Sequence, residues 1–229
     1  MFAPMSLLPP LLIATTNRDK VREIAGVLAS VPYQLTTLDQ WPEIPVPPED
    51  APTFIGNARA KACHYAHLTG ELTVAEDSGL EIDALGGAPG VQSARFGGVS
   101  ASYPGRFQLL YTALRAKGAS ASPARFVCAV ALVAGERMLF ETTAALEGSI
   151  APEPRGSGGF GYDPIFLYPP DQRTLAEMTA AEKAAISHRG QAFGALRRFL
   201  DEMHREGRDD GTDRKARQGR KDGMDRKVR

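Results

Sequence analysis

Val74-Ala75-Glu76-Asp77-Ser78-Gly79-Leu80 places two adjacent carboxylates between apolar residues. The apolar run before Glu76 predicts a strand, the acidic pair with Ser78 and Gly79 predicts a tight turn, and the apolar residues that resume at Leu80 predict a second strand. Carboxylates at the end of a strand are hard oxygen ligands that suit Mg²⁺ and phosphate-bearing molecules. Acidic residues are also common in ordinary surface turns, so this stretch alone leaves both interpretations open.

The composition indicates a globular protein without a membrane segment. The 229 residues are 43% hydrophobic and 24% charged, which suits one domain with a substantial core. No apolar run approaches the roughly 20 residues that span a bilayer. Residues 1–10 have no basic residue ahead of their leucines and contain three prolines, so we expect a poor signal peptide, and Met5 is an alternative start.

The cysteines and histidines indicate a reducing compartment and give no sign of a zinc site. Cys63, in a helical pattern, and Cys128, in a strand pattern, lie far apart without Cys-x-x-Cys spacing. We interpret them as two buried thiols of a cytoplasmic protein. The four histidines show no zinc-binding spacing.

The C-terminal segment differs from the rest in composition. Residues 205–229 contain ten Lys or Arg and six Asp or Glu, a net charge of +4 in a chain whose net charge is zero. They contain no aromatic residue and almost no apolar one, so burial cannot offset the entropy of ordering them. We therefore predict one domain over residues 1–204 and a disordered charged tail over residues 205–229. Because acids interrupt the tail's basic residues, we expect no stable nucleic-acid partner.

A strand followed by a capped helix opens the domain. Leu11 to Thr15 is an apolar run that predicts a buried strand, and the helical spacing of the apolar residues that follow predicts a helix starting near Arg18. Thr16 or Asn17 is the expected N-cap. The free amides and dipole of this helix start, with Lys20 beside them, favour an anion site, although an ordinary capped helix has the same pattern.

A proline-rich loop and a second helix come next. Five prolines between Trp41 and Pro52 predict an extended loop, which presents Glu49. The pattern from about Thr53 to Leu68 predicts a helix. Asn57 and Lys61 lie one turn apart on it and could project toward a site.

A predicted hairpin and a glycine-rich loop follow in the second half of the chain. The β-rich runs Phe126–Leu132 and Met138–Ala145 predict the hairpin. Gly156 to Pro164 contains a literal Gly-x-Gly-x-x-Gly pattern, but a dinucleotide-binding turn must open a helix, and here the strand-like run Ile165-Phe166-Leu167 follows. The glycines suit either a close approach of the backbone to a ligand or a bare surface turn.

The last predicted helices begin at a capping pattern. Thr179 is followed three residues later by Glu182, which is a capping-box spacing. Lys183 and His188-Arg189 come next. The helix after them is predicted to bury Phe193, Leu196, Leu200 and Met203.

Charged groups from separate motifs suit phosphoryl or nucleotidyl transfer. Acids that hold Mg²⁺ and bases that hold phosphate oxygens are the parts that such chemistry needs. The candidate cations and carboxylates are Lys20, Lys183, Arg189, Glu49, Asp77 and Glu76.

Seven short motifs follow one another along the chain. They are Ala14-Thr15-Thr16-Asn17-Arg18-Asp19-Lys20, Phe54-Ile55-Gly56-Asn57-Ala58, Glu76-Asp77-Ser78-Gly79-Leu80, Leu85-Gly86-Gly87-Ala88-Pro89-Gly90, Ser93-Ala94-Arg95-Phe96, Gly159-Phe160-Gly161-Tyr162-Asp163-Pro164-Ile165-Phe166 and Ala185-Ile186-Ser187-His188-Arg189-Gly190-Gln191-Ala192. In this order, from about Leu11 to Leu200, they resemble the inosine triphosphatase / dITP–XTP pyrophosphatase family of nucleotide hydrolases.

The resemblance implies a reaction, a cofactor and a fold. The reaction is hydrolysis of non-standard purine nucleoside triphosphates, chiefly ITP, dITP and XTP, to the monophosphate and pyrophosphate, which keeps these bases out of DNA and RNA. The implied cofactor is Mg²⁺, and the implied assembly is a homodimer. The implied fold is mixed α/β, with helices flanking a long curved sheet and two lobes around a central cleft.

The family's site residues map onto this chain position by position. Asp77 matches the proton acceptor and a metal ligand, and Glu49 matches a second metal ligand. The turn that would bind the triphosphate consists of Thr15, Thr16, Asn17, Arg18, Asp19 and Lys20. The other expected substrate contacts are Ser78, Phe160, Gly161, Tyr162, Asp163, Lys183, His188 and Arg189.

Two positions depart from the family pattern. Gly56 stands where many relatives carry a glutamate, so any metal or water contact from that side chain is lost here. Glu76 replaces a more frequent aspartate but keeps the carboxylate. Phe160 is the best candidate to stack on the base, and a plain core phenylalanine is the alternative interpretation.

The implied specificity has a physical rationale. Hypoxanthine and xanthine present an acceptor at O6 and a donor at N1, whereas adenine presents the reverse pair. A donor such as Arg189 or His188 facing O6 would leave buried groups unpaired with ATP, and sites of that kind discriminate by roughly 10⁴-fold. Guanine differs from hypoxanthine only at the 2-amino group, so rejection of GTP requires a close or apolar wall at C2.

Two other functions stay open. One is a pyrophosphatase for other modified nucleotides, such as dUTP or methylated pyrimidine triphosphates, which a substrate panel would separate. The other is a non-catalytic nucleotide- or RNA-binding module. Salt-dependent RNA binding that is lost when residues 205–229 are deleted would favour it.

Overall fold

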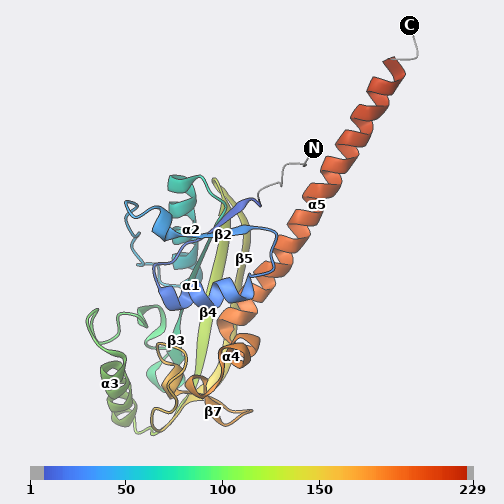
Figure 1. Cartoon of the computed structure of the whole chain (residues 1–229). Coiled ribbons are helices and arrows are strands. Elements are labelled where there is room, and N and C mark those ends of the chain that lie inside the picture. The colour runs from blue at the N-terminus through green and yellow to red at the C-terminus, as the bar shows by residue number, and fades with distance from the viewer. Residues whose placement is uncertain (1–7, 226–229) are drawn as a thin grey trace.

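The structure is a computed structural model that describes residues 8–225, with the side chains of residues 8–206 (Figure 1). The strands are β1 (Pro10–Ile13), β2 (Gln34–Thr37), β3 (Thr73–Ile82), β4 (Pro123–Ala134), β5 (Arg137–Ile150), β6 (Phe166–Tyr168) and β7 (Arg173–Thr174). The helices are α1 (Arg18–Val27), α2 (Phe54–Thr69), α3 (Tyr103–Ala116), α4 (Ala180–Ile186) and α5 (His188–Asp225). Short 3₁₀ helices lie at Leu38–Gln40, Asp83–Leu85, Gly90–Gln92, Asp163–Ile165 and Leu175–Glu177.

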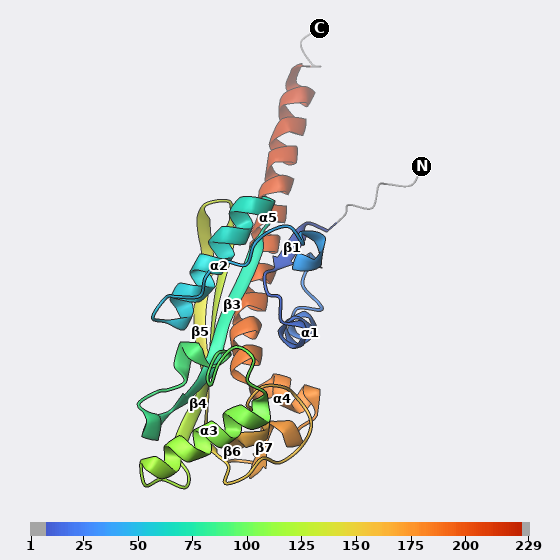
Figure 2. The same cartoon turned by 90° about the vertical axis from the view of Figure 1, so that its left-hand side faces the viewer.

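One mixed sheet runs through the whole domain, in the order β2-β1-β3-β4-β5-β6-β7. β1 is parallel to β2 and β3, and each later strand is antiparallel to its neighbour. β3, β4 and β5 are long, and they carry the sheet from one end of the domain to the other (Figures 1 and 2). The predicted mixed fold with a long sheet flanked by helices is confirmed.

Apolar side chains divide the core into three clusters, which define two lobes. In the first lobe, α2 packs on one face of the sheet through residues such as Ala58, and α1 and α5 pack on the other through Ile24 and Phe193. In the second lobe, α3 packs through Leu110 against the far part of the sheet, where Phe166 of β6 is fully buried. Figure 2 shows α2 and α3 near opposite ends of β3. Burial of each such Leu or Phe contributes about 1.5–3 kcal/mol.

The predicted turn at Glu76-Asp77-Ser78-Gly79 is wrong, because β3 is one continuous strand. Every residue from Thr73 to Ile82 pairs with a residue of β4, including the acidic pair. Gly79 is needed for close packing rather than for a turn, since a Cβ there would lie 2.5 Å from Ser93 Oγ and 2.6 Å from the Gly90 carbonyl oxygen. Because side chains alternate along a strand, Glu76 and Asp77 point to opposite faces of the sheet.

The prediction of two buried thiols holds for Cys128 but not for Cys63. Cys128 is fully buried in β4, whereas Cys63 is exposed. The buried face of α2 follows Ala58, Ala62 and Tyr65, which repeat at helical spacing. Cys63 lies on the opposite face because one residue turns a helix by about 100°.

The predicted helix boundaries and the predicted hairpin agree well with the structure. Asn17 caps α1, and Thr179 with Glu182 forms a complete capping box at α4. β4 and β5 form the hairpin, although both strands are longer than the predicted runs. The segment between Trp41 and Pro52 contains no strand or α-helix, as the prolines predicted.

α5 runs through the segment that was predicted to be a disordered tail. The helix extends from His188 to Asp225, and it buries Phe193, Leu196 and Leu200 in its first part. Continuing an existing helix avoids the cost of nucleation, and Arg, Lys and Gln are good helix formers, which accounts for helical backbone there. Side chains after Glu206, residues 226–229 and the alternative start at Met5 lie outside the described residues, so a boundary at residue 204 stays a prediction. Within the described range, no helix is both long and apolar enough to cross a bilayer.

Candidate active site

A cleft of about 230 Å³ opens beside β3 where β1 ends. β1 stops at Ile13, so the turn that follows it and the cleft occupy the space alongside the next residues of β3. Ligands of open α/β sheets commonly bind beyond the carboxyl ends of such strands. The cleft walls bring together most of the predicted site: Thr15, Thr16, Asn17, Lys20, Glu49, Asp77, Ser78, Phe160, Gly161, Tyr162, Asp163, Lys183, His188 and Arg189.

Two predicted contacts, Arg18 and Asp19, do not line this cleft. The Asn17 side chain accepts hydrogen bonds from the backbone N–H groups of Asp19 at 2.9 Å and Lys20 at 3.3 Å, which starts α1. Asp19 then turns away and pairs with Arg22 at 3.1 Å, while Arg18 is exposed. Successive side chains of a helix diverge by about 100°, so a run of six neighbours cannot all face one cleft.

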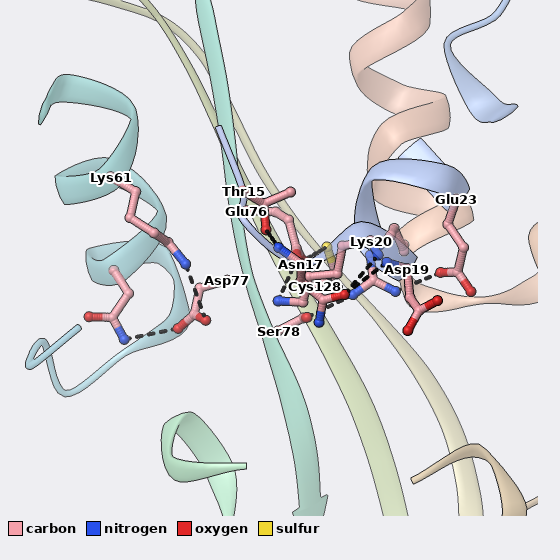
Figure 3. A network of polar contacts seen from close by, with 12 residues as sticks. Thr15, Asn17, Asp19, Lys20, Glu23, Lys61, Glu76, Asp77, Ser78 and Cys128 are labelled. Atoms are coloured by element: carbon pink, nitrogen blue, oxygen red, sulfur yellow. Dashed lines mark hydrogen bonds and ion pairs between the residues drawn. The ribbon is translucent and has the colours of Figure 1, made fainter. Parts of the chain in front are cut away.

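Figure 3 shows the two carboxylates of β3 on opposite sides of the strand. Asp77 faces α2, whereas Glu76 faces α1 and the start of α5. The cleft reaches both sides because β1 leaves this edge of β3 after Val74. The continuous strand therefore assigns the two neighbouring acids to two different sets of partners.

Asp77 belongs to a carboxylate pair that is bridged by a lysine. Asn57 Nδ2 donates a hydrogen bond to Asp77 Oδ2 at 2.9 Å. Lys61 Nζ lies 3.6 Å from Asp77 Oδ1 and 2.5 Å from Glu49 Oε1. Asn57 and Lys61 lie one turn apart on the buried face of α2, as the sequence predicted, and Lys61 is a site residue whose role the sequence left open.

The pKa values of the two carboxylates in this pair shift in opposite directions from their ordinary values. Burial raises the pKa of Asp77, and the nearby Lys61 and Asn57 offset only part of that rise. For Glu49, burial also opposes the charged form, but Lys61, Lys20 and Arg95 outweigh it and lower the pKa. The raised pKa makes Asp77 a better proton acceptor than an ordinary aspartate.

The donor set around Lys61 suits a hard divalent cation. The carboxylates of Glu49 and Asp77 both lie near the ammonium group of Lys61. Their negative charges therefore favour a positive charge between them. In the described part of the chain, no cluster of three or more His, Cys, Asp or Glu residues is arranged to hold a metal. Mg²⁺ sites commonly use one or two carboxylates and complete their shell with substrate phosphates and water, so Glu49 and Asp77 fit such a site.

Glu76 is the centre of a buried charge cluster on the other side of β3. Lys20 Nζ lies 2.6 Å from Glu76 Oε1, and Arg189 Nη2 lies 3.4 Å from Oε2. The Cys128 thiol donates to the same Oε2 at 3.2 Å. Burial opposes the charged form, but Arg189 and Lys20 prevail and hold the pKa of Glu76 far below its usual range.

The far end of the cleft gathers cations around an aromatic ring. Phe160 is half-buried, with Lys183 Nζ 4.8 Å and the Arg189 guanidinium 5.5 Å from its ring centroid. Glu23 of α1 joins both cations, at 2.7 Å from Lys183 Nζ and 2.7 Å from Arg189 Nη1. Arg189 Nη2 also donates to Ser78 Oγ at 2.8 Å. A half-exposed ring in a cleft is available for stacking, unlike a core phenylalanine.

Asp163 and Tyr162 support this end of the cleft more than they face it. Asp163 is buried, accepts the backbone N–H of Phe160 at 2.8 Å and pairs with Lys183. Tyr162 is buried against Tyr103 and Phe107, and its hydroxyl donates to the Ser93 carbonyl at 2.8 Å. Their main contacts therefore hold the Phe160 loop in place.

His188 is a buried, neutral imidazole at the start of α5. Its ring stacks on Phe126 at a centroid distance of 4.7 Å. Burial, and then the positive charge of Arg189, lower the pKa of His188 well below its ordinary value. Among the described residues, His188 Nδ1 and Arg189 Nε are buried without a hydrogen-bond partner. Both side chains line the cleft, although these two nitrogens are themselves covered.

Sequence analysis missed two residues that hold the predicted ones. Glu23 lies one helical turn after Lys20, and that spacing was the signal that could have placed it near the same cleft. Arg95 contacts Glu49 from a loop without periodicity. It belongs to a motif that resembles the family, but no role for its side chain was predicted.

Known proteins share both the sequence and the fold of this chain. A family model described as the Ham1 family matches residues 11–199. A dITP/XTP pyrophosphatase of Syntrophobacter fumaroxidans is 43% identical over 193 residues, which cover 84% of this chain and 82% of the relative. One of Exiguobacterium is 42% identical, with 81% and 94% covered.

Solved structures agree with the sequence relatives. A HAM1 protein from Coxiella burnetii is 41% identical, has a TM-score of 0.79, and is matched over 85% of this chain and 99% of its own. A nucleoside-triphosphatase / dITP/XTP pyrophosphatase from Mycobacterium abscessus is 40% identical with a TM-score of 0.65, over 82% and 98% of the two chains. The resemblance inferred from the seven motifs is thereby confirmed, and the chain belongs to the Ham1 family.

Proposed function

We propose that this chain is a Mg²⁺-dependent nucleoside triphosphate pyrophosphatase that converts ITP, dITP and XTP to the monophosphate and pyrophosphate. Its role would be to keep non-standard purines out of DNA and RNA. Membership of the Ham1 family and the names of the relatives support the proposal. The observation that carries it is one cleft that holds a carboxylate pair, several cations and an accessible ring: Glu49, Asp77, Lys20, Lys183, Arg189 and Phe160.

The carboxylate pair and the cations bind the triphosphate in different ways. Mg²⁺ bound by Glu49 and Asp77 would neutralise charge on the phosphate oxygens. Lys20 holds further phosphate oxygens by charge, and the Thr15–Lys20 turn places the start of α1 beside them. The buried Glu76 keeps Lys20 in place through the contact of 2.6 Å.

Asp77 is the residue that accepts a proton. A water molecule attacks the α-phosphorus, and its proton passes to an Asp77 oxygen as the new P–O bond forms. The bond between the α-phosphorus and the bridging oxygen breaks, and pyrophosphate leaves with the electron pair. The hydrogen bond from Asn57 holds the Asp77 carboxylate in orientation, and burial raises its pKa toward that of a useful base.

The base is recognised at the end of the cleft near Phe160. The ring stacks on the purine, with Lys183 and Arg189 nearby to favour an electron-rich O6. A donor from Arg189 or His188, both of which line the cleft, faces the O6 acceptor of hypoxanthine or xanthine. Adenine would leave such buried groups unpaired, which is the kind of mismatch that discriminates by roughly 10⁴-fold.

A substrate panel tests the proposal. Pyrophosphate release is measured from ITP, XTP, dUTP, ATP and GTP, with Mg²⁺ and with EDTA. We expect fast, Mg²⁺-dependent release from ITP and XTP only. Release from all five would retain the metal chemistry but contradict the base recognition, and preferential release from dUTP would favour the other modified-nucleotide substrates. No release from any of them would leave the non-catalytic binding module.

The assembly and location of the protein remain predictions. The homodimer follows from the resemblance, and light scattering of the purified chain at several concentrations would test it. The cytoplasmic location is a prediction from the thiol pattern, and cell fractionation would test it.

A further inference from the structure

The segment Ser93–Gly98, which begins with the motif Ser93–Phe96, contacts the proposed metal ligand Glu49 from the opposite lobe. Arg95 Nη1 donates to Glu49 Oε2 at 3.0 Å, and Arg95 Nη2 donates to the Glu49 backbone carbonyl at 2.8 Å. Arg95 is not among the cleft-lining residues, so it lies behind Glu49 rather than facing a substrate. It thus holds both the side chain and the backbone of one residue.

The segment that carries Arg95 is fixed in place by buried groups. Arg106 of α3 is buried and donates to the carbonyl oxygens of Ala94, Phe96 and Gly98 at 2.8, 2.9 and 3.1 Å. Ser93 Oγ accepts the backbone N–H of Leu80 in β3 at 2.9 Å. We call residues 93–98 the Arg95 platform. It is hydrogen-bonded to α3 and β3. A buried arginine that donates to three carbonyl oxygens holds such a segment in one conformation.

The loop that carries Glu49 is supported differently. Residues 41–53 form no strand or α-helix. Their other side-chain supports come from α2: Lys61 pairs with Glu49, Asn57 Oδ1 accepts the Ala51 N–H at 3.0 Å, and His64 contacts the Pro45 carbonyl at 2.8 Å. Arg95 therefore adds an anchor from the second lobe to a loop otherwise held by the first.

We propose that Arg95 is a positioning residue that holds Glu49 ready to bind a divalent cation. The two parallel N–H groups of a guanidinium fix Glu49 Oε2 and the backbone together, which leaves Oε1 directed toward Lys61 and Asp77. A lysine at this position would keep the charge but lack the fixed, planar arrangement of donors that holds both acceptors at once. The inference rests on the proposed function, because it takes Glu49 as a metal ligand.

The free protein provides a readout that does not depend on activity. Hydrogen–deuterium exchange of residues 41–53 is compared in the wild type, Arg95→Ala, Arg95→Lys and Arg125→Ala. Arg125 is a matched control, since its side chain is 36% exposed against 32% for Arg95, and it pairs with Asp83 at 2.7 Å outside the cleft. We expect exchange of the loop to rise about tenfold in Arg95→Ala, less in Arg95→Lys, and not at all in Arg125→Ala.

The second readout is the Mg²⁺ concentration that gives half-maximal pyrophosphate release from ITP. Loss of a residue that orients a metal ligand typically weakens metal binding, so we expect roughly a tenfold increase in Arg95→Ala, with kcat at saturating Mg²⁺ close to that of the wild type. Arg95→Lys should lie between the two, and Arg125→Ala should match the wild type.

The proposal requires that Arg95→Ala increases both the hydrogen–deuterium exchange of residues 41–53 and the Mg²⁺ concentration for half-maximal activity. Unchanged loop exchange in Arg95→Ala would overturn it, as would an unchanged Mg²⁺ requirement or an equal response in Arg125→Ala. If the wild type releases no pyrophosphate from any nucleotide, the proposed function fails. The loop exchange would still decide whether Arg95 fixes the loop of Glu49.

Discussion

Glu76 and Asp77 are neighbours in the sequence, but their surroundings push their pKa values in opposite directions. Burial raises the pKa of Asp77 above its ordinary value. The pKa of Glu76 is lowered, because the charges of Arg189 and Lys20 outweigh the effect of burial. One carboxylate is therefore suited to accept a proton, and the other stays charged as an internal counter-ion. Alternation along β3 separates these roles, since each side chain meets a different set of partners.

Replacing Glu76 tests its role as a buried counter-ion. At pH 7, we expect Glu76→Gln to lower the free energy of unfolding by about 3 kcal/mol, because Lys20 and Arg189 lose a buried partner. The pKa of Glu76 is lowered in the folded state from an ordinary value of 4.5, so its contribution is complete above pH 4.5 and is lost as the pH falls below it.

Urea unfolding of the wild type and Glu76→Gln from about pH 7 down to about pH 3 measures this contribution. The difference between the two proteins should shrink at the acid end. A difference that stays constant over the range would show that the charge of Glu76 does not stabilise the fold.

At the scale of elements, β3 passes through the site without interruption and brings both lobes to it. Its first residues pair with β1, its whole length pairs with β4, and Gly79 lets the Ser93 segment of the second lobe pack directly on its backbone. The cleft thus depends on a strand that stays extended and on a glycine that has no side chain.

Gly79→Ala should disturb this packing. An added Cβ would meet Ser93 Oγ at 2.5 Å and the Gly90 carbonyl at 2.6 Å, and we expect a loss of about 1–3 kcal/mol in the free energy of unfolding. Gly26→Ala in α1 is the control, because nothing lies within 4 Å of its added Cβ and it should stabilise the protein by about 0.5–1 kcal/mol. Urea denaturation measures both, and equal effects would refute the close-packing explanation.

Local patterns predicted the elements well and the tertiary contacts poorly. The cap at Asn17, the capping box at Thr179 and the buried face of α5 all follow from spacing within one segment. The turn at Glu76–Gly79 was wrong, because acidic and small residues are turn-like locally, whereas here Lys20 and Arg189 from distant segments stabilise Glu76 in a strand.

At the candidate site too, residues in motifs were predicted better than contacts between distant segments. Most of the predicted residues line the cleft, and they were predicted from motifs that resemble the family. Arg18 and Asp19 do not line it, because the helix turns their side chains to other directions. Arg95 makes its contact with Glu49 across 46 positions of sequence, which no spacing rule reveals.

At the scale of the whole molecule, the cleft lies between two lobes, and the apolar clusters formed by the described side chains of residues 8–206 extend to Met203. The described contacts of α5 with the sheet are therefore made by its first part. The domain boundary at residue 204 stays a prediction, which a deletion can test.

Deleting residues 207–229 should leave the enzyme intact. We expect the midpoint of thermal unfolding and the rate of pyrophosphate release from ITP to match those of the full chain, because the truncated chain keeps every core residue described in residues 8–206. Differential scanning calorimetry and the release assay measure the two. A large drop in the unfolding midpoint would show that the segment contributes to the fold.

The measurement that bears most directly on the proposed chemistry is pyrophosphate release from ITP at saturating Mg²⁺ by the wild type, Asp77→Asn and the matched control Asp83→Asn. Asp83 is exposed and pairs with Arg125, away from the cleft. Asp77→Asn keeps the shape of the side chain but removes its charge and its ability to accept a proton, so we expect a loss of at least about 10²-fold in kcat with an unchanged circular dichroism spectrum. Asp83→Asn should behave as the wild type. Near-normal turnover by Asp77→Asn would contradict the assignment of Asp77 as the proton acceptor and, with it, the proposed use of this cleft.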